Sequence, residues 1–419
     1  MIANTPPMGW NSWDCYGAAV TEEQVLQNAE YMAKYLKPYG WEYVVVDIQW
    51  SAPDADSHEY HAFSDLRMDD YGRLIPAENR FPSAAGGKGF RPLADKIHGM
   101  GLKFGIHIMR GMPRMAAHRR LPIKDSDATC DQAANPHSIC MWNPDMYGLR
   151  CETPQARAYY DSIFRLYAEW GVDFVKCDDI AREYPPCEKE IEVISAACRE
   201  CGRDIVLSLS PGPAPLERAE HLKTWANMWR ITDDFWDKWE LLKGMFERAE
   251  KWCVHAGPGH WPDADMLPGG ALRQCYGPEN RTQFTQAEQR TMMTLWCMMR
   301  SPLMIGGEMT KNDDFTLKLL TNGEVLAIEK ESWSAHPLYT TEKESAWVAP
   351  RRDGTGFYLA LFNLSDEERT VKVSAKELGM EEAASVKELW TGEESEATGA
   401  ICAAIDAHDA KVYRCSLVK

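Results

Sequence analysis

The stretch YVVVDIQW, residues 43–50, has the pattern of a buried strand that ends in a carboxylate. Three consecutive valines need apolar cover on both faces, which is typical of strands in a parallel sheet covered by helices. Asp47 then places a charge at the end of the strand, and Ile48 follows it with a bulky apolar side chain. The meaning of this pair depends on what the end of the strand faces.

The same arrangement of a short apolar run, polar residues and a helix-period segment recurs along the chain. The candidate strands are residues 8–13, 43–50, 103–109, 172–179, 204–210, 226–234, 260–267 and 301–307. Eight strand–helix units in succession predict an α/β fold of the (β/α)8 TIM-barrel type. An open doubly wound sheet is the alternative, but the chain has no G-x-G-x-x-G turn to favour it.

The sequence pattern changes near residue 331. Residues 346–378 alternate apolar and polar side chains around turn signals such as Asp353-Gly354, which is typical of an antiparallel sheet. We therefore expect a catalytic barrel over residues 1–330 and a C-terminal β-sandwich domain over residues 331–419. Two long stretches without clear periodicity, 51–90 and 110–152, follow the second and third strands, and loops of such length usually form functional walls or lids.

Charge and hydropathy narrow the class of partner. The net charge of −17 argues against nucleic acid or an anionic membrane, since both need clustered lysine and arginine. The chain has no run of 18 apolar residues, so no membrane span is expected. Its first ten residues lack the pattern of a secretory signal, which favours a cytoplasmic location. We expect a small carbohydrate as the partner and leave a homo-oligomer open.

Metal and cofactor chemistry find little support in the sequence. The pair Cys198-x-x-Cys201 would need a second pair at zinc-binding spacing, which the chain lacks, so the 13 cysteines are expected to be structural thiols. The third strand carries the single His107 rather than an H-x-H pair. A Mg²⁺ site made of carboxylates alone remains an alternative. We expect no metal and no cofactor.

Polar side chains gather where the predicted strands end, and in a barrel of this type chemistry takes place at those ends. They are Trp13, Asp47, His107, Asp178, Ser210, Arg230, Asp234 and Asp265. Carboxylates accept strongly from hydroxyl groups, so such a pocket suits a neutral, polyhydroxylated substrate. Two carboxylates about 5–5.5 Å apart can cleave a glycosidic bond with retention of configuration. Lys176 would keep a nucleophilic carboxylate beside it ionised, and Arg230 would orient nearby oxygens.

Several motifs resemble those of glycoside hydrolase family 27, which is best known for α-galactosidases and α-N-acetylgalactosaminidases. They are TPPMGWNSW (5–13), FVKCDD (174–179), WRITDDFWDKW (229–239), HWPDADML (260–267) and SPLMIGGEM (301–309). The resemblance covers about residues 1–330, and the tail is similar in size to the C-terminal β-sandwich of that family. It implies a metal-independent, retaining glycosidase.

The resemblance also implies roles for individual residues. It places the nucleophile on Asp178 and the acid/base on Asp234, where Asp233 replaces a glycine common in the family. Its sugar-binding positions fall on Trp13, Asp47, His107, Lys176, Arg230 and Asp265. Ser210 matches the position that reads the substituent at C2, and His107 stands where a tyrosine is common. Trp142 is a further candidate wall residue, as a stacking platform or as plain loop packing.

Ile48 is the departure that bears on the substrate. α-Galactosidases of this family carry two adjacent acids here, which together hold the 4-OH and 6-OH of galactose. Ile48 replaces the second acid and fills the space of the CH2OH arm, so the sugar that fits is galactose without C6, which is β-L-arabinopyranose. We therefore predict a β-L-arabinopyranosidase. If Ile48 instead faces the barrel wall, the chain is an α-galactosidase or an α-N-acetylgalactosaminidase. A metal-dependent barrel hydrolase and a non-catalytic sugar-binding barrel are the remaining alternatives.

Overall fold

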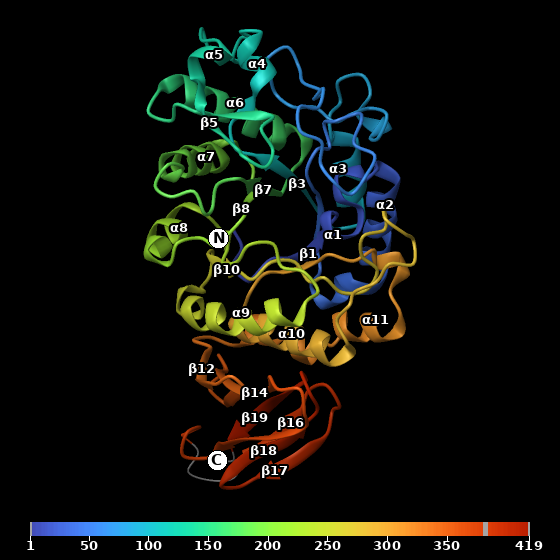
Figure 1. Ribbon diagram of the computed structural model, residues 1–419, viewed down its shortest axis with the longest axis vertical. Helices are drawn as coiled ribbons and strands as arrows, with labels where there is room; N and C mark the ends of the chain where they lie inside the picture. The colour runs from blue at the N-terminus through green and yellow to red at the C-terminus, as the bar shows by residue number, and fades with distance from the viewer. Residues whose placement is uncertain (1, 380–383, 418–419) are drawn as a thin grey trace.

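The computed structural model describes residues 2–379 and 384–417, and its larger part is a parallel barrel (Figure 1). Eight strands pair in the order β10-β9-β8-β7-β3-β2-β1-β11. They are β1 (Met8–Asn11), β2 (Tyr43–Val46), β3 (Lys103–Met109), β7 (Phe174–Asp178), β8 (Val206–Leu209), β9 (Met228–Arg230), β10 (Trp261–Asp263) and β11 (Leu303–Ile305). Each lies within one of the eight stretches predicted from the sequence, so the barrel prediction is confirmed.

The barrel closes between the segment after β10 and strand β11. The backbone N–H of Leu267 donates to the carbonyl of Met304 at 2.8 Å, and Gly306 N–H donates to the carbonyl of Leu267 at 3.0 Å. This parallel bridge joins the two edges of the sheet. The carboxyl ends of all eight strands therefore face one shared opening.

Helices surround the barrel on its outside (Figure 1). The longer ones are α2 (Glu22–Tyr31), α3 (Arg91–Gly99), α6 (Pro154–Trp170), α7 (Glu188–Glu200), α8 (Ala219–Trp225), α9 (Trp239–Trp252), α10 (Gln286–Met299) and α11 (Asp314–Leu320). The helix α2 begins with a capping box, in which the side chains of Thr21 and Gln24 each accept the other's backbone N–H. Short helices are α1 (Trp13–Tyr16), α4 (Arg114–His118), α5 (Cys130–Ala133), α12 (Gly323–Leu326) and α13 (Ile328–Glu331).

The valines of β2 divide between two apolar layers. Val45 packs inside the barrel with Tyr43, whereas Val44 and Val46 pack in the layer between the barrel and its helices. Side chains alternate along a strand, so Asp47 continues the inward-facing series. The strand that reads as uniformly apolar thus carries a carboxylate to the open end of the barrel.

The stretch 110–152, expected to be an irregular wall, contains a three-stranded antiparallel sheet. Its strands pair in the order β4-β6-β5 and are β4 (Met112–Pro113), β5 (Ala134–Ile139) and β6 (Met146–Leu149). The sequence of β5, ANPHSI, is polar and has no regular alternation. Its strand structure therefore depends on pairing with β6 and not on local preference.

Antiparallel strands form the C-terminal part of the chain. Six pair in the order β12-β13-β14-β19-β16-β17, and β15 pairs with β18. They are β12 (His336–Thr340), β13 (Glu344–Pro350), β14 (Gly356–Asn363), β15 (Arg369–Ser374), β16 (Ala384–Glu388), β17 (Glu394–Ala397), β18 (Ala400–Ile405) and β19 (Ala410–Leu417). The sandwich packs on the barrel through α9 and α10. The ring of His408 stacks on that of Trp239 with centroids 3.8 Å apart, and Asp409 pairs with Arg290.

None of the described helices is long and apolar enough to cross a membrane. The 13 cysteines all occur as free thiols, and most of them are buried.

Candidate active site

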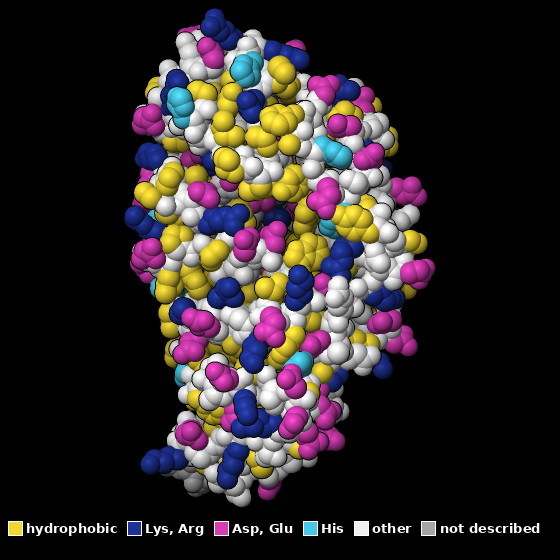
Figure 2. Space-filling model, viewed as in Figure 1, with side chains coloured by type: hydrophobic (Ala, Val, Ile, Leu, Met, Phe, Trp, Pro, Cys, Tyr) yellow, Lys and Arg dark blue, Asp and Glu magenta, His cyan; other side chains and the backbone are white. Residues whose placement is uncertain are grey.

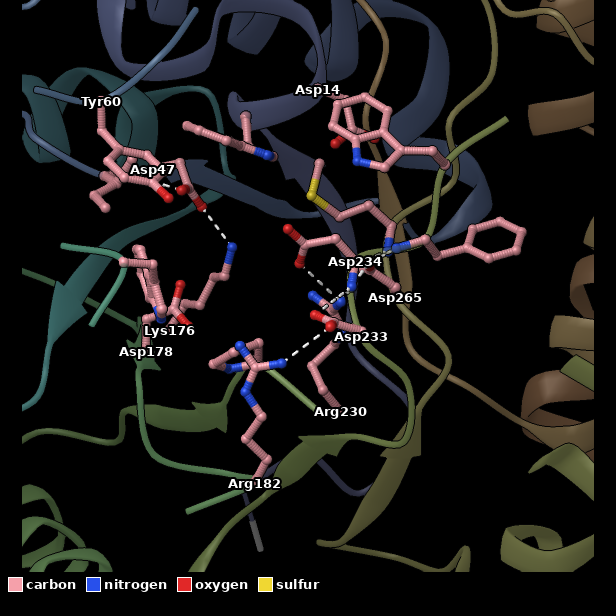
Figure 3. Close-up of a pocket in the computed structure, with 17 residues that line it drawn as sticks. Asp14, Asp47, Tyr60, Lys176, Asp178, Arg182, Arg230, Asp233, Asp234 and Asp265 are labelled. Atoms are coloured by element: carbon pink, nitrogen blue, oxygen red, sulfur yellow. Dashed lines mark hydrogen bonds and ion pairs between the residues drawn. The ribbon is translucent and has the colours of Figure 1, made fainter. Parts of the chain in front are cut away.

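A cavity of about 810 Å³, including its open mouth, lies at the carboxyl ends of the barrel strands (Figure 3). Figure 2 shows the mouth as a hollow with hydrophobic, acidic and basic side chains around it. The lining residues are Trp13, Asp14, Asp47, Ile48, Tyr60, Trp142, Lys176, Asp178, Arg182, Pro211, Arg230, Asp233, Asp234, Phe235, Trp236, Asp265 and Met266. Carboxylates from several different strand ends therefore face one space, beside a group of aromatic rings.

Asp47 is held on the β2 side of the cavity by three donors. Its Oδ2 accepts from Lys176 Nζ at 2.9 Å and from Asn11 Nδ2 at 2.8 Å, and its Oδ1 accepts from the Ile48 N–H at 2.8 Å. Burial alone would raise the pKa of Asp47, but the charges of Lys176 and His107 together with these hydrogen bonds lower it. The ionised carboxylate is thus fixed in place and can accept from sugar hydroxyls.

Asp178 and Lys176 point to the same space because they are two residues apart on β7. Asp178 Oδ2 lies 3.0 Å from His107 Nε2, and its Oδ1 accepts from the Asp179 N–H at 3.0 Å. Burial would raise the pKa of Asp178. The hydrogen bond from His107 and the charges of His107 and Lys176 outweigh burial and hold the pKa well below its ordinary range. An ionised, partly desolvated carboxylate of this kind suits a nucleophile.

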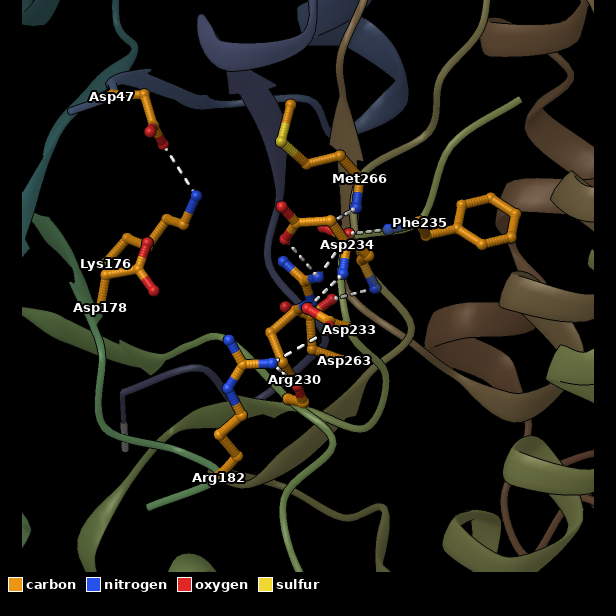
Figure 4. Close-up of polar contacts among 12 residues, drawn as sticks. Asp47, Lys176, Asp178, Arg182, Arg230, Asp233, Asp234, Phe235, Asp263 and Met266 are labelled. Atoms are coloured by element: carbon orange, nitrogen blue, oxygen red, sulfur yellow. Dashed lines mark hydrogen bonds and ion pairs between the residues drawn. The ribbon is translucent and has the colours of Figure 1, made fainter. Parts of the chain in front are cut away.

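Arg230, at the end of β9, joins two carboxylates on the other side of the cavity (Figure 4). Its Nη2 lies 2.6 Å from Asp265 Oδ2 and 3.2 Å from Asp234 Oδ1. Asp265 also accepts from the backbone N–H groups of Phe235 and Met266, each at 2.7 Å. Burial and the nearby Asp234 charge raise the pKa of Asp265, and the Arg230 guanidinium opposes this shift.

Asp234 differs from the other carboxylates in its exposure. Its side chain is 58% exposed, compared with 13% for Asp178 and 7% for Asp265. Figure 4 shows Asp178 and Asp234 on opposite sides of the cavity. One side of the cavity therefore offers a largely covered, ionised carboxylate, and the other offers an accessible one that can exchange protons with solvent.

Ile48 lies between the cavity and a small apolar cluster. Its side chain is 4% exposed and packs in a cluster with Met109, Cys140 and Met146, while also lining the cavity. Beside it the rings of Trp13 and Tyr60 stack with centroids 6.1 Å apart, and Tyr60 meets Trp142 edge-on at 5.3 Å. This side of the cavity is therefore apolar and aromatic, next to the polar Asp47.

Most residues predicted from the sequence line the cavity together, but His107 and Ser210 do not. His107 is 2% exposed and contacts Asp178, so the structure gives it a role toward the nucleophile candidate. Ser210 is 1% exposed and lines a smaller space beneath the cavity, beside Lys176 and Arg230. The residue that reaches the cavity from this strand is the next one, Pro211.

Several lining residues were not predicted as site residues. They are Asp14, Tyr60, Arg182, Pro211, Asp233, Phe235, Trp236 and Met266. Tyr60 lies in the stretch 51–90, whose length indicated a wall but not which side chain would face inward. Asp14 follows Trp13 directly, and adjacency to a predicted site residue was the available signal.

Asp14 is a fully buried carboxyl group at the edge of the cavity. Its Oδ2 accepts no hydrogen bond from the described residues, and a Cβ on Gly306 would lie 2.0 Å from this atom. Burial, reinforced by the charge of Asp265, raises the pKa of Asp14 well above its ordinary value, with Lys176 acting in the opposite direction. Burial thus favours the protonated form of Asp14, and the close approach of this carboxyl group leaves room only for glycine at position 306.

Comparison with known proteins identifies the family. The family model for α-galactosidase A matches residues 142–331, and the model for the α-galactosidase C-terminal β-sandwich domain matches residues 341–415. A family-27 β-L-arabinopyranosidase from Geobacillus stearothermophilus superposes with a TM-score of 0.96 at 53% identity, covering 99% of this chain and 97% of that one. The chain belongs to glycoside hydrolase family 27.

Other family members are similar over the whole length. An α-N-acetylgalactosaminidase-like protein of Bacillus halodurans C-125 is 48% identical, with a TM-score of 0.90 and coverage of 100% of this chain and 99% of that one. The α-galactosidase of Coffea arabica is 28% identical over 98% of this chain and 93% of its own length. The prediction of a glycoside hydrolase is thereby confirmed. Among the described residues, no group of three or more His, Cys, Asp or Glu side chains is arranged to hold a metal ion.

Proposed function

We propose that this chain is a retaining exo-glycosidase that releases terminal β-L-arabinopyranose. The observation that carries this proposal is Ile48, which presents an apolar side chain to the cavity directly beside the hydroxyl acceptor Asp47. A galactose ring placed with its 4-OH on Asp47 would direct C6 and its hydroxyl toward this side chain. A desolvated hydroxyl without a partner costs about 1–3 kcal/mol. β-L-Arabinopyranose has the same ring and hydroxyl orientations but no C6, so it avoids this cost.

In the proposed mechanism, Asp178 attacks the anomeric carbon and forms a covalent glycosyl-enzyme intermediate. Asp234 protonates the glycosidic oxygen as that bond breaks, and then takes a proton from the water that releases the sugar. The low pKa of Asp178 keeps it ionised for attack, with Lys176 and His107 as the groups that maintain this state. The exposure of Asp234 suits a group that exchanges its proton with solvent in each cycle.

The residues that would bind the sugar hydroxyls follow from placing the ring with its 4-OH on Asp47. We propose that Asp47 and Lys176, which are joined at 2.9 Å, bind adjacent hydroxyls of the sugar ring, and that Asp265 and Arg230 bind hydroxyls on the other side. Trp13 and Trp142 offer aromatic faces for the apolar C–H surface of the ring. We propose no metal or cofactor in this reaction, since these carboxylates and cations are sufficient for a two-step displacement.

An α-galactosidase is the second candidate, and Trp142 is the observation that favours it. Its indole Nε1 is buried and donates no hydrogen bond to any described residue, although the ring lines the cavity together with Ile48. A C6 hydroxyl could accept from this N–H in place of a carboxylate contact. Trp142→Phe keeps an aromatic ring, though a smaller one, and removes the donor, so it would lower activity on galactosides specifically if this candidate is correct.

The deciding experiment compares kcat/KM of the purified protein on p-nitrophenyl β-L-arabinopyranoside and p-nitrophenyl α-D-galactopyranoside. We expect the arabinopyranoside to be preferred by about 10-fold or more, corresponding to the unpaired hydroxyl of galactose. A higher kcat/KM on the galactoside would refute the proposed substrate and support the second candidate. Nuclear magnetic resonance of the first-formed sugar anomer tests retention independently of the substrate.

A further inference from the structure

An ion pair lies at the mouth of the cavity, on the side of Asp234 (Figure 4). Arg182 comes from the segment after β7, and Asp233 comes from the segment between β9 and α9. Arg182 Nη1 donates to Asp233 Oδ2 at 3.0 Å and lies 3.4 Å from the carbonyl of Gly212. Both side chains line the cavity, but they are 32% and 65% exposed. They therefore reach solvent at its rim, unlike the buried carboxylates at its base.

The position of Asp234 indicates what this rim would contact. A general acid must lie within hydrogen-bond reach of the oxygen that it protonates, and that oxygen connects the bound sugar to the leaving group. Asp233 Oδ1 accepts the backbone N–H of Asp234 at 2.9 Å, so the Asp233 side chain is bound to the backbone of the residue that carries the acid. The leaving group must therefore extend past Asp234 along the rim that Arg182 and Asp233 form. This step rests on the proposed role of Asp234.

The chemistry of the rim suits a hydroxylated leaving group. A guanidinium carries five N–H donors, and Asp233 and Gly212 take only donors on Nη1. Arg182 Nε also lies 3.9 Å from Glu183 Oε1, so acidic groups outnumber the single cation at this rim and disfavour an anionic leaving group, while neither ion pair uses the donors on Nη2. Tyr60 lies across the cavity from Arg182 in Figure 3, and Tyr60 and Trp236 add aromatic surface to the same lining.

We propose that Arg182 and Asp233 form the leaving-group subsite of this glycosidase, and that this subsite binds a neutral sugar residue through hydrogen bonds from Arg182 to its hydroxyls. Asp233 then has two functions. It fixes the guanidinium by the 3.0 Å contact, and it accepts the Asp234 N–H, which couples recognition of the leaving group to the position of the acid. A glycine at position 233 would provide neither contact.

Substrates that differ only in the leaving group test this proposal. Kinetics are measured for Arg182→Met and Asp233→Asn on a p-nitrophenyl glycoside and on a disaccharide that carries the same terminal sugar. The nitrophenolate group departs without protonation and has none of the sugar hydroxyls that Arg182 is proposed to bind. The Asn variant keeps an oxygen for the Asp234 N–H while removing the charge that holds Arg182. Arg119→Met, at an exposed arginine that does not line the cavity, is the matched control.

We expect Arg182→Met to lower kcat/KM on the disaccharide by about 10-fold to 100-fold, the range for losing one hydrogen bond to a charged group. The p-nitrophenyl glycoside should change by less than about threefold, and the control should match the parent on both substrates. Asp233→Asn should show a smaller loss, again confined to the disaccharide. The loss of kcat/KM that Arg182→Met shows on the disaccharide alone should appear as a higher KM for that substrate.

Two results would overturn the proposal. A disaccharide loss confined to kcat, with KM unchanged, would show that the pair only supports the position of Asp234, and unchanged kinetics on the disaccharide would show that the leaving group does not contact Arg182. The comparison is made with arabinopyranosides and with galactosides, so it remains valid whichever sugar the enzyme prefers. A failure of the proposed sugar specificity would appear in the parent enzyme, whereas a failure of this subsite would appear only in the variants.

Discussion

Replacing Ile48 by Asp should shift the sugar preference of this enzyme toward galactosides. The change puts an acceptor beside Asp47, at the site where the side chain of Ile48 now separates the cavity from Met109, Cys140 and Met146. Asp is also shorter than Ile, so it opens space for a CH2OH arm. Ile48→Ala opens space without adding an acceptor and is therefore the matched control.

The size of the shift follows from the contact that is gained. A hydrogen bond to a charged group contributes about 1.5–3 kcal/mol. The ratio of kcat/KM for galactoside over arabinopyranoside should therefore rise by about 10-fold to 100-fold in Ile48→Asp. Ile48→Ala should raise it less, since only the steric barrier is removed. Ile48 is 4% exposed, so its loss should also cost about 2–5 kcal/mol of unfolding free energy.

The assay measures initial rates on the two p-nitrophenyl glycosides, with melting temperatures to establish that each variant is folded. An unchanged ratio in a folded Ile48→Asp protein would refute the assignment of Ile48 to sugar selection. An equal ratio in the Ala and Asp variants would refute the acceptor argument, and space alone would then explain the preference.

Asp178→Asn should lower the turnover of both substrates by at least about 10³-fold, because the amide cannot act as the nucleophile. A variant that turns over substrate at the rate of the parent enzyme would contradict the assigned role. Asp234→Asn should impair a disaccharide far more than a p-nitrophenyl glycoside, since only the former needs a protonated leaving group, and similar losses on both would argue against the acid/base role. His107→Phe should move the acid limb of the kcat/KM profile to higher pH, because the hydrogen bond that lowers the pKa of Asp178 is lost; an unmoved limb would count against that coupling. Because the pKa of Asp14 is raised, the folded state keeps a proton that the unfolded state releases above about pH 4. Stability, measured as melting temperature, should therefore fall as the pH rises from about 4 to the pKa of the folded state. Asp14→Asn should flatten this fall, and an unchanged slope would contradict the raised pKa.

The barrel could be predicted from the sequence because each of its strands has a recognisable local pattern of residues. A parallel strand covered on both faces is a nearly continuous apolar run, and YVVVDIQW shows this pattern along with the carboxylate at its end. Since all strand ends of a barrel meet at one opening, Asp47, Asp178 and Asp265 could be assigned to one pocket before any distance was known. The strand β5 had no such signal, because its polar residues form a strand only by pairing with β6.

Residue identity at a strand end does not reveal where a side chain points within the pocket. His107 occupies a predicted sugar-binding position but contacts Asp178, and Ser210 lies below the cavity while Pro211 lines it. The turn after β8 sets the positions of Ser210 and Pro211, and the backbone geometry of such turns has no period that can be read from the sequence. Arg182 and Asp233 lie 51 positions apart in the chain and meet only because β7 and β9 end at the same opening.

The amino-acid pattern alone was thus enough for the barrel, the family resemblance and the identity of the carboxylates, because each depends on short segments with strong local preferences. The folded molecule was needed to learn that His107 and Lys176 lower the pKa of Asp178 against the effect of burial, that burial raises the pKa of Asp14, and that the mouth carries an ion pair. These properties depend on burial and on distances between charges from different strands. A pKa or a subsite is a property of such distances, which local sequence preferences leave undefined.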